Sequence, residues 1–459
     1  MTLSVRTIFR LTTPLVVFGA VLGALTLVSR FDAAAPVVPA PAPVGGAVTD
    51  RAGGERLEEL QRAIAARPAD AAAYAALGEA FLQRARETGD PGWYARAGRA
   101  FAAGLRRDPR DLGALLGAGT LANLRHDFRA GLRLGEAAHR AEPALARPYV
   151  VLADAQIELG RSRAALASIQ RLVDLKPGLA SYARASYFRE LSGDRAGAVA
   201  AMRLAVSAGG TAASVAYVQV LLGDLELGRG RVGAARDAYR AALAAVPDYP
   251  QALAGLARVA VAGGDLRGAA ARLRPSTARL PLTTNLTLLA DVELAAGRHA
   301  AAATTLAVVR AQRRLLLAAG AVPDAEAVLF AADHGSPARA VALGRRVWRS
   351  APSVRSADAL GWALTRAGRP VEGLPWAHRA LRLGSRDPLF RYHAGIAARA
   401  VGARAAGAGA AGARAAGERA VGAGAADARA EAARDLQIAA AGRGALSPLA
   451  YRRVQEALR

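Results

Sequence analysis

Cysteine is absent from the 459 residues of this chain. Without thiols the chain can form no disulfide, no thiolate metal site, no cysteine nucleophile and no lipid anchor on cysteine. Aromatic residues make up only 5% of the sequence, and the scarcity of strand-forming residues disfavours a β-sheet. The 53% hydrophobic fraction is mostly Ala, Val and Leu. Because Ala is the best helix former, this composition predicts helices packed through small side chains.

Lysine is nearly absent as well, since Lys176 is the only lysine among 61 basic residues. The net charge is +24, which suits nucleic acid or an anionic membrane surface. The arginines are scattered along the chain, however, and high Ala and Arg content is typical of a GC-rich genome. Two interpretations stay open: a solvated surface that reflects codon bias, and a surface that binds a polyanion.

One apolar run stands near the N-terminus, where residues 11–29 carry no charge. Nineteen helical residues nearly cross a bilayer core about 30 Å thick, and Arg6 and Arg10 before the run favour a cytoplasmic N-terminus. The sequence therefore predicts a membrane anchor with an extracytoplasmic body. The alternative is a secreted protein, cleaved after a signal peptide near Ala35.

Prolines recur at a fixed interval of 34 residues, at 109, 143 and 177 and again at 247 and 281. A period of this length indicates a solenoid of helical repeats. In the unit that ends at Pro177, Tyr149 and Leu152 lie on one face of a predicted first helix. Gly160 makes a turn, and Ile169 lies on a facing stripe of a second helix. Proline then ends the second helix.

Small residues recur where the two helices of each unit cross, at Gly78, Gly223 and Ala257, and opposite them at Ala97, Ala235 and Ala269. With the closing proline, this pattern resembles the tetratricopeptide repeat (TPR). The resemblance implies an all-α, helix-turn-helix solenoid with a right-handed superhelix, here preceded by a transmembrane helix. With no catalytic motif in the sequence, the resemblance implies a non-catalytic scaffold that binds a protein or peptide partner.

The predicted organisation has five parts. They are an anchor at 1–30, an Ala/Pro-rich spacer at 31–55, the repeat array at 56–400, a mobile Ala/Gly/Arg loop at 401–430, and closing helices at 431–459.

No motif in the sequence predicts catalysis, a cofactor, a metal site or a small-molecule substrate. The glycines at 228, 230 and 233 have dinucleotide-binding spacing, but they fall on a predicted inter-helix turn and lack the required strand. The six histidines show no metal-ligand spacing. His299 and His334 are expected at turns on the surface.

The concave wall of the superhelix, formed by the first helices, is the candidate binding site. Aromatic residues there would anchor an apolar side chain, and arginines would pair with carboxylates. The predicted groove residues are Arg147, Asp154, Arg184, Phe188, Tyr217, Asp224, Arg258 and Asn285. The leading hypothesis is an envelope scaffold that holds a protein or peptide. The alternative is an arginine-rich binder of an anionic polymer, such as a cell-wall polyanion, an acidic polysaccharide or nucleic acid.

The dependence of binding on salt separates these two hypotheses. We expect the body, Arg51 to Arg459, to retain specific proteins from native membranes at both low and high salt. Binding to a polyanion falls steeply as salt rises, because it is driven by counterion release. Recovery of polymer alone, lost at high salt, would refute the scaffold hypothesis.

Overall fold

The computed structural model describes residues 46–412 and 418–459, and within these ranges the regular elements are helices. The predicted membrane segment, residues 11–29, and the spacer before residue 46 lie outside the described residues. Among the helices that are described, none combines the length and the apolar character needed to cross a bilayer.

Antiparallel helix pairs make up most of the chain, as the 34-residue period predicted. A lone helix, α2 (Gly46–Ala66), packs on the first pair. Seven pairs follow: α3 (Ala71–Thr88) with α4 (Gly92–Arg107), α5 (Leu112–Leu124) with α6 (Phe128–Ala141), α7 (Arg147–Glu158) with α8 (Ser162–Leu175), α9 (Leu179–Leu191) with α10 (Arg195–Ser207), α11 (Ala212–Gly228) with α12 (Val232–Ala245), α13 (Pro250–Ala262) with α14 (Leu266–Arg279), and α15 (Thr283–Ala295) with α16 (His299–Ala318).

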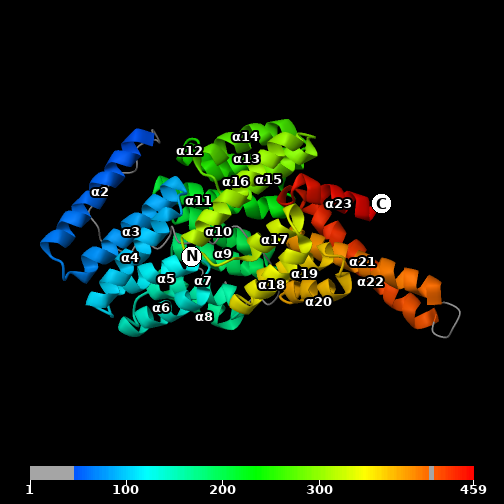
Figure 1. Cartoon of the computed structure of the whole chain (residues 1–459), viewed down its shortest axis with the longest axis horizontal. Coiled ribbons are helices and arrows are strands. Elements are labelled where there is room, and N and C mark those ends of the chain that lie inside the picture. The colour runs from blue at the N-terminus through cyan, green and yellow to red at the C-terminus, as the bar shows by residue number, and fades with distance from the viewer. Residues whose placement is uncertain (1–45, 413–417) are drawn as a thin grey trace, which may run out of the picture.

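Three further pairs and a closing segment complete the array. They are α17 (Ala325–His334) with α18 (Pro337–Ser350), α19 (Val354–Arg366) with α20 (Pro370–Leu381), α21 (Pro388–Gly412) with α22 (Glu418–Ala441), then the 3-10 turn η3 (Arg443–Ala445) and α23 (Pro448–Leu458). Figure 1 shows the α21–α22 hairpin projecting from the body, while α23 returns toward α15.

Several pairs turn where the repeat pattern placed a glycine, whereas α5 and α6 turn at His126, with φ of 61°. Gly230, with φ of 77°, joins α11 to α12, so the dinucleotide-like glycine spacing is an inter-helix turn as predicted. The small residues Ala97, Ala235 and Ala269 are fully buried at the helix crossings. These observations confirm an all-helical, TPR-like solenoid.

An aromatic side chain on a second helix locks neighbouring pairs together. The ring of Tyr239 on α12 lies against Gly223 of its own pair and against Gly255 of the next. Phe101 on α4 contacts Gly78 and Gly117 in the same way. A Cβ atom added at any of these glycines would overlap the ring, so glycine sets how closely the helices approach.

Residues 401–412 and 418–430 differ from the prediction, which made the whole of 401–430 a mobile loop. Helix α21 continues to Gly412 and α22 begins at Glu418, and the two pack against each other. The physical reason is that alanine, the best helix former, outweighs the cost of about 1 kcal/mol for each interspersed glycine. Ala428 and Ala432 are buried in the hairpin.

The array does not leave its concave face open, because its second half folds back over its first half. Gln312 of α16 donates to the Gly89 carbonyl at 3.3 Å, and the Val322 amide donates to the Arg125 carbonyl at 2.7 Å. Arg129 of α6 donates to the carbonyl of Arg349 at 2.9 Å. The open groove expected from the repeats is therefore partly filled by the chain itself.

The contact between Tyr239 and the two glycines generates a stability prediction. We expect Gly223→Ala and Gly255→Ala each to lower the free energy of unfolding by about 1–2 kcal/mol, because overpacking costs about 1–3 kcal/mol and exceeds the gain in helix propensity. Urea denaturation followed by circular dichroism measures the change. Gly233→Ala is the matched control, since nothing lies within 4 Å of a Cβ atom there. A change at Gly223 as small as the change at Gly233 would contradict this account of the packing.

Candidate partner-binding site

A cavity of about 540 Å³ lies where the folded-back repeats face the first helices of the array. Helices α11, α13 and α15 supply one wall, and α16, α17 and α19 supply another. Residues of α3, α4 and α6 also reach it, because α16 and the segment after it return to the first repeats. Its volume falls within the range of about 300–1,000 Å³ typical of ligand sites.

Three side chains on the first wall repeat at an interval of 34 residues: Tyr217 on α11, Gln251 on α13 and Asn285. Tyr217 and Asn285 are only 2% and 3% exposed. The Tyr217 hydroxyl, the Gln251 Oε1 atom and the Asn285 Nδ2 atom are buried and have no hydrogen-bond partner in the protein. We call these three residues the polar row. Burial also raises the pKa of Tyr217 well above its usual value, so its hydroxyl stays protonated and can donate.

An ion pair lies further along the same two helices, seven residues after Tyr217 and Gln251. Arg258 Nη1 lies 3.0 Å from Asp224 Oδ1, and the Tyr239 hydroxyl donates to the same oxygen at 2.6 Å. Both charged residues line the cavity, and their side chains are 20–24% exposed. Asp224 is therefore held by the ring that also packs on the glycines, which fixes the ion pair to the repeat framework.

The second wall carries several charges held in pairs. Burial tends to raise the pKa of Asp324, but His126 and Arg313 hold it below its usual range. Burial and the neighbouring Asp324 raise the pKa of Glu326. On the same wall, Arg355 of α19 lies 3.6 Å from Glu326 of α17, and it also lies 3.5 Å from Glu158 of α7. The folded-back repeats are thus joined to α7 by an ion pair at the cavity edge.

Charges of both signs line the cavity in nearly equal number. Five arginines face four carboxylates, namely Arg86, Arg258, Arg313, Arg346 and Arg355 with Glu158, Asp224, Asp324 and Glu326. Apolar side chains fill the space between them, including those of Phe128, Leu221 and Phe330. The surroundings of a ligand would therefore be mixed and almost neutral.

The structure brings together four of the eight predicted groove residues. Tyr217, Asp224, Arg258 and Asn285 all line the cavity, whereas Arg147, Asp154, Arg184 and Phe188 do not. That the first four bind a partner stays a prediction. Phe188 packs at the edge of the largest core cluster, which α19, α20 and α21 share with α9.

Asp154 and Arg184 bind each other in the interior. Arg184 Nη2 and Nε lie 2.7 and 2.9 Å from the two carboxylate oxygens of Asp154, and the residues are 0% and 4% exposed. Their charges are satisfied within the chain, so neither side chain presents a surface to a partner. The repeat pattern placed both on the concave wall but could not show that other repeats cover that part of it.

Gln251 and the residues of the second wall were not among the predicted groove residues. The 34-residue interval from Tyr217 to Asn285 passes through Gln251 and could have identified it. No periodic signal marks Arg313, Glu326 or Arg355, because they reach the cavity through the return of the chain rather than through their place in a repeat.

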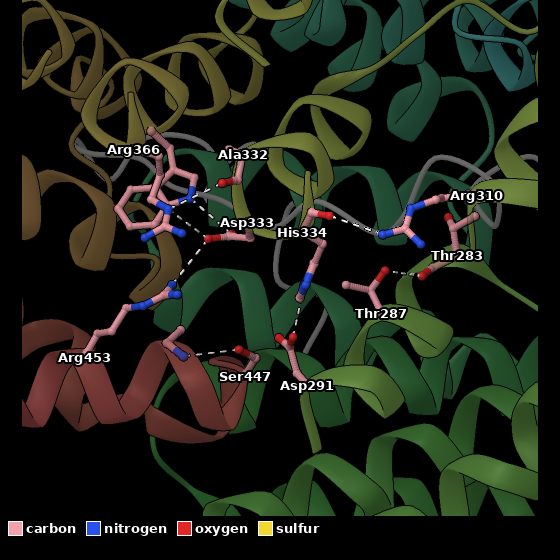
Figure 2. Close-up of polar contacts among 12 residues, drawn as sticks. Thr283, Thr287, Asp291, Arg310, Ala332, Asp333, His334, Arg366, Ser447 and Arg453 are labelled. Atoms are coloured by element: carbon pink, nitrogen blue, oxygen red, sulfur yellow. Dashed lines mark hydrogen bonds and ion pairs between the residues drawn. The ribbon is translucent and has the colours of Figure 1, made fainter. Parts of the chain in front are cut away.

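Ion pairs next to the cavity hold the C-terminal helix α23 against the rest of the array. Asp333 at the end of α17 lies 3.5 Å from Arg366 of α19 and 3.3 Å from Arg453 of α23, as Figure 2 shows. His334 points the other way, with Nε2 3.1 Å from Asp291 of α15. Because its side chain is only 7% exposed, the expectation of a surface position was wrong for His334. The turn that contains His334 packs against α15, where Asp291 contacts the imidazole.

Comparison with known proteins agrees with the repeat geometry. A model of the tetratricopeptide repeat matches residues 226–286, which span the turn after α11 to the start of α15. The described chain is thus a TPR-like solenoid. No curated protein matches the sequence.

The chain is similar to several solved structures, each less than 25% identical to it. Human IFIT1, in a dimer with PPP-AAAA, is 17% identical over 68% of this chain and 72% of its own, with a TM-score of 0.43. PilW, a type IV pilus biogenesis factor, is 20% identical over 45% and 97%, with a TM-score of 0.37. YrrB, a TPR protein with an unusual peptide-binding site, is 16% identical over 50% and 96%, with a TM-score of 0.24.

The internal pair of Asp154 and Arg184 generates a stability prediction. We expect Arg184→Met to lower the free energy of unfolding by about 3–5 kcal/mol, because it leaves a buried carboxylate without its partner. The double variant Asp154→Leu with Arg184→Met should recover most of that loss, since it removes both charges. Urea denaturation of the three proteins measures this. The exposed pair Arg56–Glu59 is the control, and Arg56→Met should change stability little. A neutral Arg184→Met would mean that the pair is not internal.

Proposed function

We propose that this chain is a non-catalytic protein-interaction scaffold whose central cavity holds a segment of a partner protein. The composition of the cavity wall carries this proposal. The lining combines apolar side chains with charges of both signs, and buried polar atoms of the polar row are left without partners. Ligand sites of this kind combine a mostly apolar lining with a few well-placed polar groups.

The near balance of charge in the cavity favours a protein segment over an anionic polymer. A channel for a polyanion gathers positive charge along the path of the backbone, whereas here four carboxylates stand among five arginines. Such an arrangement would repel parts of a uniformly negative chain. The net charge of +24 belongs to the whole chain, and its effect on binding is measured by the salt dependence already described.

The location of the scaffold is part of the same proposal and rests on the sequence. Residues 11–29 would anchor the protein in a membrane, and the Ala/Pro-rich residues 31–55 would hold the array away from the bilayer on the extracytoplasmic side. Partners would then be proteins of the cell envelope. Cleavage near Ala35 would release the same array as a secreted scaffold.

Two exposed leucines provide a matched test of the cavity. Leu317 on α16 is 51% exposed and borders the cavity, whereas Leu204 on α10 is 40% exposed and lies away from it. We expect Leu317→Arg to abolish capture of specific proteins from native membranes by the full-length protein in mild detergent. A charge at this position would have to be desolvated when a partner segment enters.

Leu204→Arg should leave that capture unchanged, because Leu204 lies on an exposed helix face away from the cavity. Quantitative mass spectrometry of the captured proteins reads out both variants at low and high salt. Equal capture by the two variants would contradict binding in the cavity. Loss of capture by both, with only nucleic acid or polysaccharide remaining at low salt, would favour the anionic-polymer hypothesis.

A further inference from the structure

Three arginines converge on one buried carboxylate at the turn between α11 and α12. Arg203 Nη2 of α10 donates to Glu226 Oε1 at 3.3 Å. Arg229 Nη1 and Arg231 Nε lie 3.6 and 3.9 Å from Glu226 Oε2, which is too far for a hydrogen bond. Helices α10, α11 and α12 lie next to one another (Figure 1). We call these four residues the arginine cluster, and none of them lines the central cavity.

The arginine cluster holds more positive charge than its own carboxylate neutralises. Three guanidinium groups against one carboxylate leave a surplus of two positive charges. A later repeat shows that the fold does not require this surplus. There Glu293 takes the same place, four residues before the turn glycine, and it is held by the Thr305 hydroxyl at 2.9 Å and by Arg274 at 3.7 Å. The surplus at Glu226 is therefore a local feature of one turn.

Unused hydrogen-bond donors of the arginine cluster face solvent. Within the described part of the chain, the guanidinium groups of Arg229 and Arg231 donate no hydrogen bond. The side chain of Arg231 is 58% exposed and that of Arg229 is 17% exposed. Burial lowers the pKa of Arg229, the attraction of Glu226 opposes that shift, and the repulsion of Arg231 and Arg203 adds to it. An anion that approaches from solvent would relieve this repulsion.

We propose that the arginine cluster binds a phosphate group in its dianionic, phosphomonoester form. Such a group carries a charge of about −1.5 to −2 near neutral pH and has three acceptor oxygens, so it matches the surplus of two positive charges. The planar forks of guanidinium groups bind phosphate oxygens bidentately. A carboxylate or a phosphodiester carries a single negative charge and would leave half of the surplus. This site lies outside the central cavity, and the proposal goes beyond the scaffold function.

The phosphate group lies on the solvent side of Glu226, whose own side chain is only 2% exposed. Arg229 and Arg231 approach the same Glu226 oxygen, so their outward N–H groups reach one phosphate together. Arg203, held by Glu226 and 63% exposed, offers its remaining donors from α10. The bound phosphate therefore links α10 to the turn between α11 and α12 and stabilises that part of the array.

Thermal melting of the full-length protein in non-ionic detergent tests the site, because a ligand of the folded state raises the melting temperature with its concentration. Inorganic phosphate is titrated against chloride at constant ionic strength. We expect phosphate to raise the melting temperature and chloride to leave it unchanged. Arg229→Gln and Arg231→Gln should each raise the dissociation constant about tenfold, the loss of one hydrogen bond between charged groups. Arg236→Gln is the matched control, since Arg236 is exposed on α12 outside the arginine cluster, and it should bind phosphate as the wild type does.

Glu226→Gln separates phosphate binding from a purely structural role of the arginine cluster. The glutamine keeps an oxygen that accepts from Arg203, but it removes a negative charge beside the bound phosphate. The variant should therefore bind phosphate about fivefold more tightly, the effect of one like charge about 4 Å away in a water-like dielectric. A cluster with only a structural role predicts a lower melting temperature for this variant and no gain from phosphate.

Several outcomes would overturn the proposal. They are the absence of any melting shift with phosphate, wild-type affinity in Arg231→Gln, and weaker binding by Glu226→Gln. An equal loss in Arg236→Gln would also overturn it, because phosphate would then respond to the net charge of +24 as a whole.

Micelles doped with phosphatidic acid, whose headgroup is a phosphomonoester, distinguish the source of the phosphate. A larger melting shift with these micelles than with the same concentration of inorganic phosphate, lost in Arg231→Gln, would support the site and assign a lipid headgroup to it. A shift with inorganic phosphate and none with the micelles would support the site and assign a soluble phosphate ligand. Neither result depends on Leu317→Arg, so the phosphate site and the proposed scaffold function can fail separately.

Discussion

The contact of one aromatic ring with two glycines is the constraint on which the rest of the structure depends. Tyr239 lies against Gly223 of its own pair and Gly255 of the next, and Phe101 makes the same kind of contact with Gly78 and Gly117 earlier in the chain. The ring fixes both the distance within a pair and the distance between pairs. Because its hydroxyl also binds Asp224, the same side chain that spaces the repeats positions a charge in the cavity. The regular spacing of Tyr217, Gln251 and Asn285 follows from this framework.

Periodic features of the fold could be predicted from the sequence, because they arise from contacts between residues fewer than about forty positions apart. The closing prolines, the turn at Gly230 and the buried Ala235 all follow from the pattern within one repeat. The helices at 401–412 and 418–430 escaped prediction for a different reason. Its composition lacks large apolar residues, which indicated a loop, while the helix propensity of alanine decided the outcome.

The fold-back of the second half could not be predicted, because it depends on single contacts between distant repeats. The return of α16 to the first pair involves Gln312 and Gly89, and the return of α18 involves Arg349 and Arg129. These residues have no periodic counterpart, and an isolated arginine or glutamine in a sequence does not indicate its partner. Asp154 and Arg184 were therefore predicted to lie on the concave wall, whereas they lie in the interior and pair with each other.

The candidate site arises from this combination of a periodic wall and a non-periodic cover. Where α19 and α20 press directly on the first half, the core is continuous and charged residues such as Asp154 and Arg184 have to pair within it. Where α16 and α17 face α11 and α13, space remains and the polar row finds no partner. A repeat array without the fold-back would expose the same row to water, which would satisfy each polar group and compete with any ligand. The fold-back therefore encloses the row in low-dielectric surroundings, where a hydrogen bond is stronger than on an open surface.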